Sequence, residues 1–107
     1  MPASALGVLL KNLREQRGLS LRELGKLAEV DHAYIFRLET GDKEAPSDDA
    51  LGKLIRALKP GKREADMLLY LAQNTNTAAE LVELTLQDPA VSFNVFAGVA
   101  GFAFAGK

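Results

Sequence analysis

The chain has 107 residues, of which 48% are apolar, so it is large enough to bury the core of one domain. It contains no cysteine and a single histidine, which excludes disulfides, thiolate metal sites and metal sites built from several histidines. Its net charge of −1 is unevenly divided, with a balance of +3 over residues 1–63 and −4 over residues 64–107. An anionic partner would therefore meet the N-terminal part of the chain.

Several classes of protein are disfavoured by what the sequence lacks. It has no phosphate-cradling glycine motif, no metal-ligand spacing and no nucleophile–base pair, so we expect neither an enzyme nor a bound cofactor. No uninterrupted apolar run reaches about 18 residues, which argues against a membrane-spanning helix. The N-terminus lacks the pattern of a secretory leader, and we expect a cytoplasmic protein that does not contact a membrane.

Apolar residues recur at three- and four-residue intervals along most of the chain, which predicts an all-α fold. Two short helices meet at a tight break within residues 19–41. Ser20 and Glu23 have the spacing of a capping box, Asp31 can cap the second helix, and Gly41 can end it. The remaining helices are expected at 6–17, 48–58, 62–73 and 78–86, with a further short helix at 89–97 opened by Pro89; Ser47 and Thr77 can cap the helices that follow them. Gly25, in the middle of its helix, suggests a close crossing of two helices, and Tyr34 and Ile35 are assigned to the core.

The stretch from Leu19 to Gly41, with its flanking leucines, resembles the helix-turn-helix of phage-repressor/Cro-like proteins, the XRE family of transcriptional regulators. The matching residues are Leu10, Leu13, Arg14, Arg17, Gly18, Leu19, Ser20, Glu23, Leu24, Ala28, Val30, Ile35, Leu38, Glu39, Gly41, Pro46, Leu51, Leu54 and Leu58. The resemblance covers residues 6–59. It implies a lambda-repressor-like five-helix DNA-binding domain over residues 1–72, followed by a helical, phenylalanine-rich extension over residues 73–107. It also implies that Arg14 pairs with Glu39.

The resemblance further implies that the second helix of the pair enters the major groove of double-stranded DNA. Carried over position by position, the residues facing the bases would be Asp31, His32, Ala33, Phe36 and Arg37. Arg37 is the best candidate for a bidentate contact to guanine, although a surface salt bridge is the alternative. His32 could instead be a solvent-exposed residue at the start of a helix. The expected phosphate contacts are Ser20, Arg22, Lys26 and Lys43.

The C-terminal extension is distinguished by four closely spaced phenylalanines among alanines and glycines: Phe93, Phe96, Phe102 and Phe104. They could cap the domain's own core, or they could form a dimer interface or dock a partner protein. A membrane-surface role is less favoured because the segment has no basic face. The sequence leaves open whether residues 89–107 form a helix, a strand or a disordered tail.

Three functional hypotheses follow from these observations. The first is a DNA-binding transcriptional repressor that acts as a homodimer on a two-fold symmetric operator, with recognition helices one DNA turn apart. The alternative is an antitoxin-type protein that binds a partner through its C-terminal extension and represses its own operon. The third is a helix-turn-helix fold that has lost DNA binding, for which Phe36 and the acidic residues Asp42 and Glu44 are the argument.

Overall fold

The chain is all-helical in a computed structural model that describes residues 3–105, with side chains described over residues 3–102. The helices are α1 (Ala5–Gln16), α2 (Leu21–Ala28), α3 (His32–Thr40), α4 (Asp48–Leu58), α5 (Lys62–Gln73), α6 (Ala79–Gln87) and α7 (Phe93–Ala105). The described residues contain no strand, so the all-α prediction is confirmed. None of these helices is long and apolar enough to cross a bilayer.

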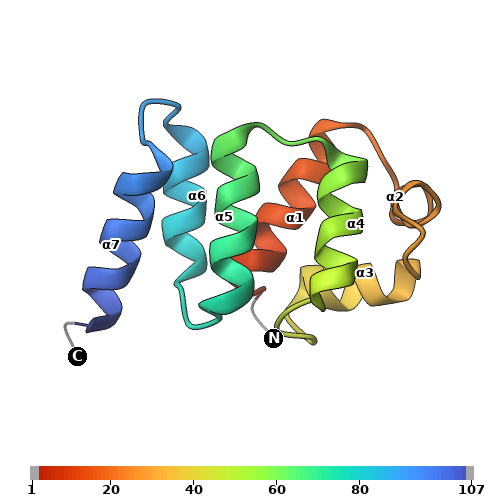
Figure 1. Ribbon diagram of the computed structural model, residues 1–107, viewed down its shortest axis with the longest axis horizontal. Coiled ribbons are helices and arrows are strands. Elements are labelled where there is room, and N and C mark those ends of the chain that lie inside the picture. Colours follow the sequence, from red (N-terminus) through yellow and green to blue (C-terminus); the bar gives the residue numbers. More distant parts are fainter. Residues whose placement is uncertain (1–2, 106–107) are drawn as a thin grey trace.

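The helices are arranged along a body that measures 40 × 27 × 22 Å. Figure 1 shows α2 and α3 at one end of the long axis and α7 at the other, with α1, α4, α5 and α6 between them. The two helices of the expected helix-turn-helix, α2 and α3, therefore lie at the opposite end of the molecule from α7.

Side-chain caps explain where the first helices begin. Ser20 Oγ accepts a hydrogen bond from the Glu23 amide at 3.0 Å, and Ser47 Oγ accepts one from the Ala50 amide at 3.2 Å, as the sequence predicts. Ser4 caps α1 in the same way, so α1 begins at Ala5, one residue earlier than expected.

The two C-terminal helices begin at different residues from those predicted. Thr77 does not cap α6, because its hydroxyl donates to the carbonyl of Asn74 at 2.8 Å. Pro89 does not open a helix either: it lies in a turn, and α7 starts only at Phe93 and runs to Ala105. Arg63 stabilises this turn because its Nη1 donates to the carbonyls of Asp88 and Val91 at 2.9 and 2.8 Å.

One hydrophobic core runs through the molecule. It contains residues from every helix: Ala5, Leu6, Leu9, Leu10, Leu13, Leu24, Ala28, Ile35, Leu38, Leu51, Leu54, Leu58, Met67, Leu68, Leu71, Val82 and Phe96. Helices α1 and α3 approach each other closely at Gly7. A Cβ atom on Gly7 would lie 2.5 Å from the Leu38 carbonyl oxygen, so only glycine allows this packing.

Candidate DNA-binding surface

The turn between α2 and α3 places the two helices of the motif in close contact. Glu29 adopts the left-handed conformation with φ 58°, and the Val30 amide donates to the Gly25 carbonyl at 3.0 Å. A Cβ atom on Gly25 would lie 2.8 Å from the Val30 oxygen and 3.2 Å from His32 Cβ. Gly25 is therefore required for the close crossing that its position in the middle of a helix suggested.

The outward side of α3 carries most of the residues expected to meet DNA bases. His32, Phe36 and Arg37 are exposed and Ala33 is half-buried. Their spacing of one, four and five residues places them on one side of the helix, opposite the buried Ile35, Leu38 and Glu39. Asp31, the fifth expected base contact, caps α3 by accepting a hydrogen bond from the Ala33 amide at 3.1 Å.

The side chain of Arg37 is free to contact a ligand. No carboxylate in the part of the chain with described side chains lies within ion-pairing distance of its guanidinium, so the alternative role in a surface salt bridge is not supported. Phe36 is 52% exposed beside it. This solvent-facing aromatic side chain offers an apolar contact to a thymine methyl group or a deoxyribose.

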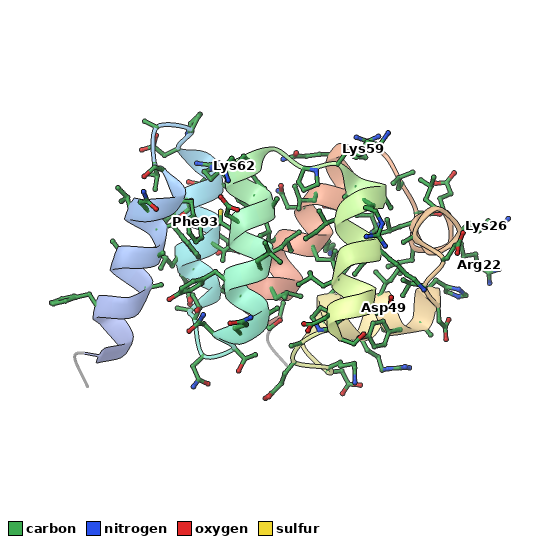
Figure 2. The ribbon with its side chains drawn as sticks, in the orientation of Figure 1. Arg22, Lys26, Asp49, Lys59, Lys62 and Phe93 are labelled. Atoms are coloured by element: carbon green, nitrogen blue, oxygen red, sulfur yellow. The ribbon has the colours of Figure 1, made fainter. Side chains whose placement is uncertain are left out.

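Two of the expected phosphate contacts lie beside the start of α3. Arg22 and Lys26 of α2 line a cleft of about 330 Å³ together with Asp31 and His32. Figure 2 shows both cationic side chains at the outer edge of the molecule, pointing into solvent. The two cations therefore flank the exposed side of α3, where a duplex entering along α3 would present its backbone.

The third expected phosphate contact, Ser20, takes part in a complete capping box. Its amide donates to Glu23 Oε1 at 2.8 Å, and its hydroxyl accepts from the Glu23 amide. These hydrogen bonds lower the pKa of the Glu23 carboxyl. The amides of Leu21 and Arg22, in the first turn of α2, have no acceptor among the described residues, and helix N-termini of this kind attract anions.

The loop after α3, which holds Lys43, is fixed by a residue that the sequence assigned only to the core. Tyr34 is half-buried, and its hydroxyl accepts a hydrogen bond from the Ser47 amide at 3.1 Å. Lys43 Nζ lies 5.5 Å from the centre of the Tyr34 ring, within the range of a cation–π contact. The backbone amide of Lys43 also donates a hydrogen bond to the Arg37 carbonyl at 3.0 Å. Tyr34 and Lys43 are nine residues apart, with most of α3 between them, so no local pattern in the sequence predicts this contact.

The pair that joins α1 to the end of α3 is present as expected. Arg14 Nε and Nη2 donate to the two carboxylate oxygens of Glu39 at 2.7 and 3.0 Å, and Nη1 donates to the Leu19 carbonyl at 2.8 Å. The hydrogen bond and the charge of Glu39 raise the pKa of Arg14. This bidentate pair holds the end of α3 on α1 and thereby sets the direction in which the outward residues of α3 point.

The phenylalanines of the extension do not share one environment. Phe96 is 1% exposed within the core, and Phe93 and Phe96 both pack edge-on against Tyr70, with ring centres 6.1 and 5.8 Å from it. Phe96 is therefore a core residue, covered by the chain itself. Phe102 is 79% exposed. Phe104 lies outside the residues whose side chains the structure describes.

Comparisons with known proteins agree with this geometry. Residues 5–67 match the family described as a helix-turn-helix domain. The crystal structure of the clp gene regulator ClgR from C. glutamicum is similar, with a TM-score of 0.53 and 32% sequence identity, over 68% of this chain and 90% of that chain. No curated protein matches the chain. Because the family match covers more than half of its residues, the chain belongs to the XRE-like helix-turn-helix family.

Proposed function

We propose that the chain is a sequence-specific DNA-binding transcriptional regulator that inserts α3 into the major groove. The observation that carries the proposal is the outward side of α3, where an unpaired arginine, a histidine and a small residue are flanked by Arg22 and Lys26. The similarity to ClgR, a gene regulator, supports the same function. If its binding site lies within a promoter, the bound regulator would block that promoter and act as a repressor.

In this proposal Arg37 reads a base, while Arg22 and Lys26 of α2 and Lys43 of the loop after α3 contact phosphates. A bidentate contact from Arg37 to guanine contributes about 1–3 kcal/mol of discrimination against another base. Arg22, Lys26 and Lys43 contribute affinity that does not depend on sequence and that falls as salt increases. The two kinds of contact therefore have different signatures in a binding experiment.

The experiment is selection of duplexes from a random library, followed by fluorescence anisotropy on the selected duplex. We expect Arg37→Ala to lose tenfold or more of the preference for the selected duplex over random duplex, about 1.4 kcal/mol. Lys62→Ala is the matched control. The Lys62 side chain is 89% exposed at the start of α5, so this substitution removes one positive charge at a site far from α3. Failure to enrich any sequence would contradict the proposal.

We propose further that the regulator is a homodimer whose copies meet at α7. Val95, Val99 and Phe102 are 54%, 48% and 79% exposed at spacings of four and three residues, so they form one apolar stripe. Beside it, Val99 and Leu84 line a groove of about 800 Å³ that has no charged residue in its lining. A surface without charge can face its own copy across a two-fold axis without repulsion between like charges.

A dimer formed at α7 changes the expected spacing of the operator. The long axis of the chain is 40 Å, and α3 and α7 lie at its opposite ends (Figure 1). Two copies joined end to end at α7 separate their recognition helices by more than one DNA turn of about 34 Å. Half-sites two turns apart, about 68 Å, fit this arrangement better than the one-turn spacing expected from the family.

Light scattering and a half-site spacing series test this dimer. We expect Val99→Glu with Phe102→Glu to produce a monomer, whereas Leu27→Glu, at the far end of the molecule, leaves the dimer intact. We expect tightest binding to the duplex with half-sites two turns apart. A wild-type monomer at micromolar concentration would exclude the α7 dimer and leave the DNA-binding proposal standing.

The same apolar stripe supports the second candidate function, an antitoxin-type protein. The extension folds back onto α5 through Phe93 and Phe96 and still leaves Val95, Val99 and Phe102 exposed. A partner protein could occupy the stripe in place of a second copy. Coexpression with the product of the adjacent gene separates the two functions: a stable complex that dissociates on Val99→Glu favours the antitoxin.

A further inference from the structure

A second cleft lies on a different side of the helix-turn-helix, between the ends of α1 and α2 and the C-terminal half of α4. It has a volume of about 350 Å³, and Leu27, Ala28 and Ala57 form its apolar part. Leu27 is 59% exposed. A cleft of this size with an exposed leucine can receive one large aliphatic or aromatic side chain and offers it apolar contact.

The rim of this cleft is strongly cationic. It carries Arg17, Lys53, Arg56 and Lys59 and a single carboxylate, that of Glu29. Lys53 is paired with Asp49 at 3.3 Å. No carboxylate within residues 3–102 forms an ion pair with any of the other three cations, so they are available to an external anion.

Two residues with side chains adopt, at this cleft, a left-handed backbone conformation that glycine adopts more readily. Glu29 and Lys59 have φ values of 58° and 48°, and they are the only described non-glycine residues with positive φ. Each lies at the C-terminal cap of a helix, where glycine is favoured and a side chain costs about 1 kcal/mol. Both residues line this cleft. The C-terminal ends of α2 and α4 therefore present their cap side chains at the same cleft.

The position of the cleft separates it from the DNA-binding surface. Figure 2 shows Lys59 at the opposite end of α4 from Asp49, and Figure 1 places α3 beside the Asp49 end. A duplex bound along α3 would therefore leave Lys59 and the α4 side of the cleft uncovered. Phosphates and sugars also have no large apolar group with which to cover Leu27, whereas a protein segment does.

We propose that this cleft binds an acidic segment of another protein. Carboxylates of the segment meet Arg17, Arg56 and Lys59, and one leucine- or phenylalanine-sized side chain packs on Leu27. The complementary charges select the partner and speed its encounter, while the apolar contact supplies a central anchor. This function goes beyond DNA binding, because it gives a regulator already seated on DNA a separate surface for a protein.

The test uses a fluorescein-labelled peptide of glutamates and aspartates with a leucine at every fourth position, measured by anisotropy. We expect the wild type to bind it with an affinity that falls with salt. Arg17→Glu with Arg56→Glu should weaken binding tenfold or more, and so should Leu27→Ser. The matched control is Lys11→Glu with Lys62→Glu, which makes the same charge change at exposed residues outside the cleft.

Each result decides the proposal. The proposal is supported if peptide affinity falls in the cleft variants but not in the Lys11→Glu with Lys62→Glu control, and if the two double variants bind the duplex equally well. Equal peptide affinity in both double variants, or no binding at millimolar peptide, overturns it. Selective loss of duplex binding by Arg17→Glu with Arg56→Glu also overturns it and assigns the cleft to nucleic acid. A peptide in which serine replaces leucine should bind more weakly, and equal binding would exclude the apolar anchor.

Discussion

Replacement of Arg14 by alanine tests whether the pair with Glu39 holds α3 in place. The Glu39 side chain is 5% exposed and the Arg14 side chain is 12% exposed. Arg14→Ala leaves a buried carboxylate without its two donors, and breaking such a pair costs about 3–5 kcal/mol. The lost hydrogen bond to the Leu19 carbonyl adds about 1 kcal/mol at most. We therefore expect a destabilisation of about 3–6 kcal/mol, a large part of the stability of a domain of this size.

Urea unfolding followed by circular dichroism measures this loss. With a slope of about 2 kcal/mol per molar urea, the midpoint should fall by about 2 M. Arg17→Ala is the control: this exposed arginine forms no described ion pair, and we expect a change within about 0.5 kcal/mol. The double variant Arg14→Ala with Glu39→Ala should lose less than the sum of the single variants.

A small effect of Arg14→Ala would refute this reasoning. A loss below about 1 kcal/mol is the value expected of a solvent-exposed ion pair. It would mean that water reaches Glu39 once the arginine is removed. Additive losses in the double-mutant cycle would refute it in another way, because the two side chains would then act independently.

Three further predictions concern the core, the turn and the cap. Phe96→Ala should destabilise the chain by about 3–5 kcal/mol in the same unfolding assay, since its ring is buried; a loss below 1 kcal/mol would mean that α7 is not docked. Gly25→Ala should lower both stability and duplex affinity, because its Cβ would meet the Val30 oxygen; unchanged affinity would contradict the close crossing. The pKa of Glu23 is lowered, so its charge stabilises the fold above its unfolded pKa of about 4.3, and this contribution disappears as pH falls through the folded pKa. The difference in melting temperature between wild type and Glu23→Gln should therefore be present at pH 6 and vanish by pH 3.

Much of the helix-turn-helix could be predicted because its determinants are local. A capping box needs only Ser20 and Glu23 three residues apart, and both of its hydrogen bonds are present. The outward position of Arg37 follows from helical spacing alone. The pair between Arg14 and Glu39 is not local, and it was predicted from the family resemblance.

The C-terminal third was harder to predict because distant residues decide it. Pro89 is as acceptable in a turn as in the first turn of a helix, and Arg63 favours the turn by bonding to two of its carbonyls. Which phenylalanine turns inward depends on where α5 places Tyr70. The contact between Tyr34 and Ser47 also joins residues 13 positions apart and leaves no periodic signal.

The continuity of the core limits what deletion mapping can reveal about this protein. Val82 and Phe96 belong to the same buried cluster as Leu9 and Leu38, which support the recognition helix. A chain cut before α6 would expose that cluster and destabilise α3, and with it the DNA binding proposed for that helix. Loss of function on truncation would therefore look like removal of an effector or dimerisation module. Point changes confined to surface atoms are the only substitutions that separate the roles of the two ends.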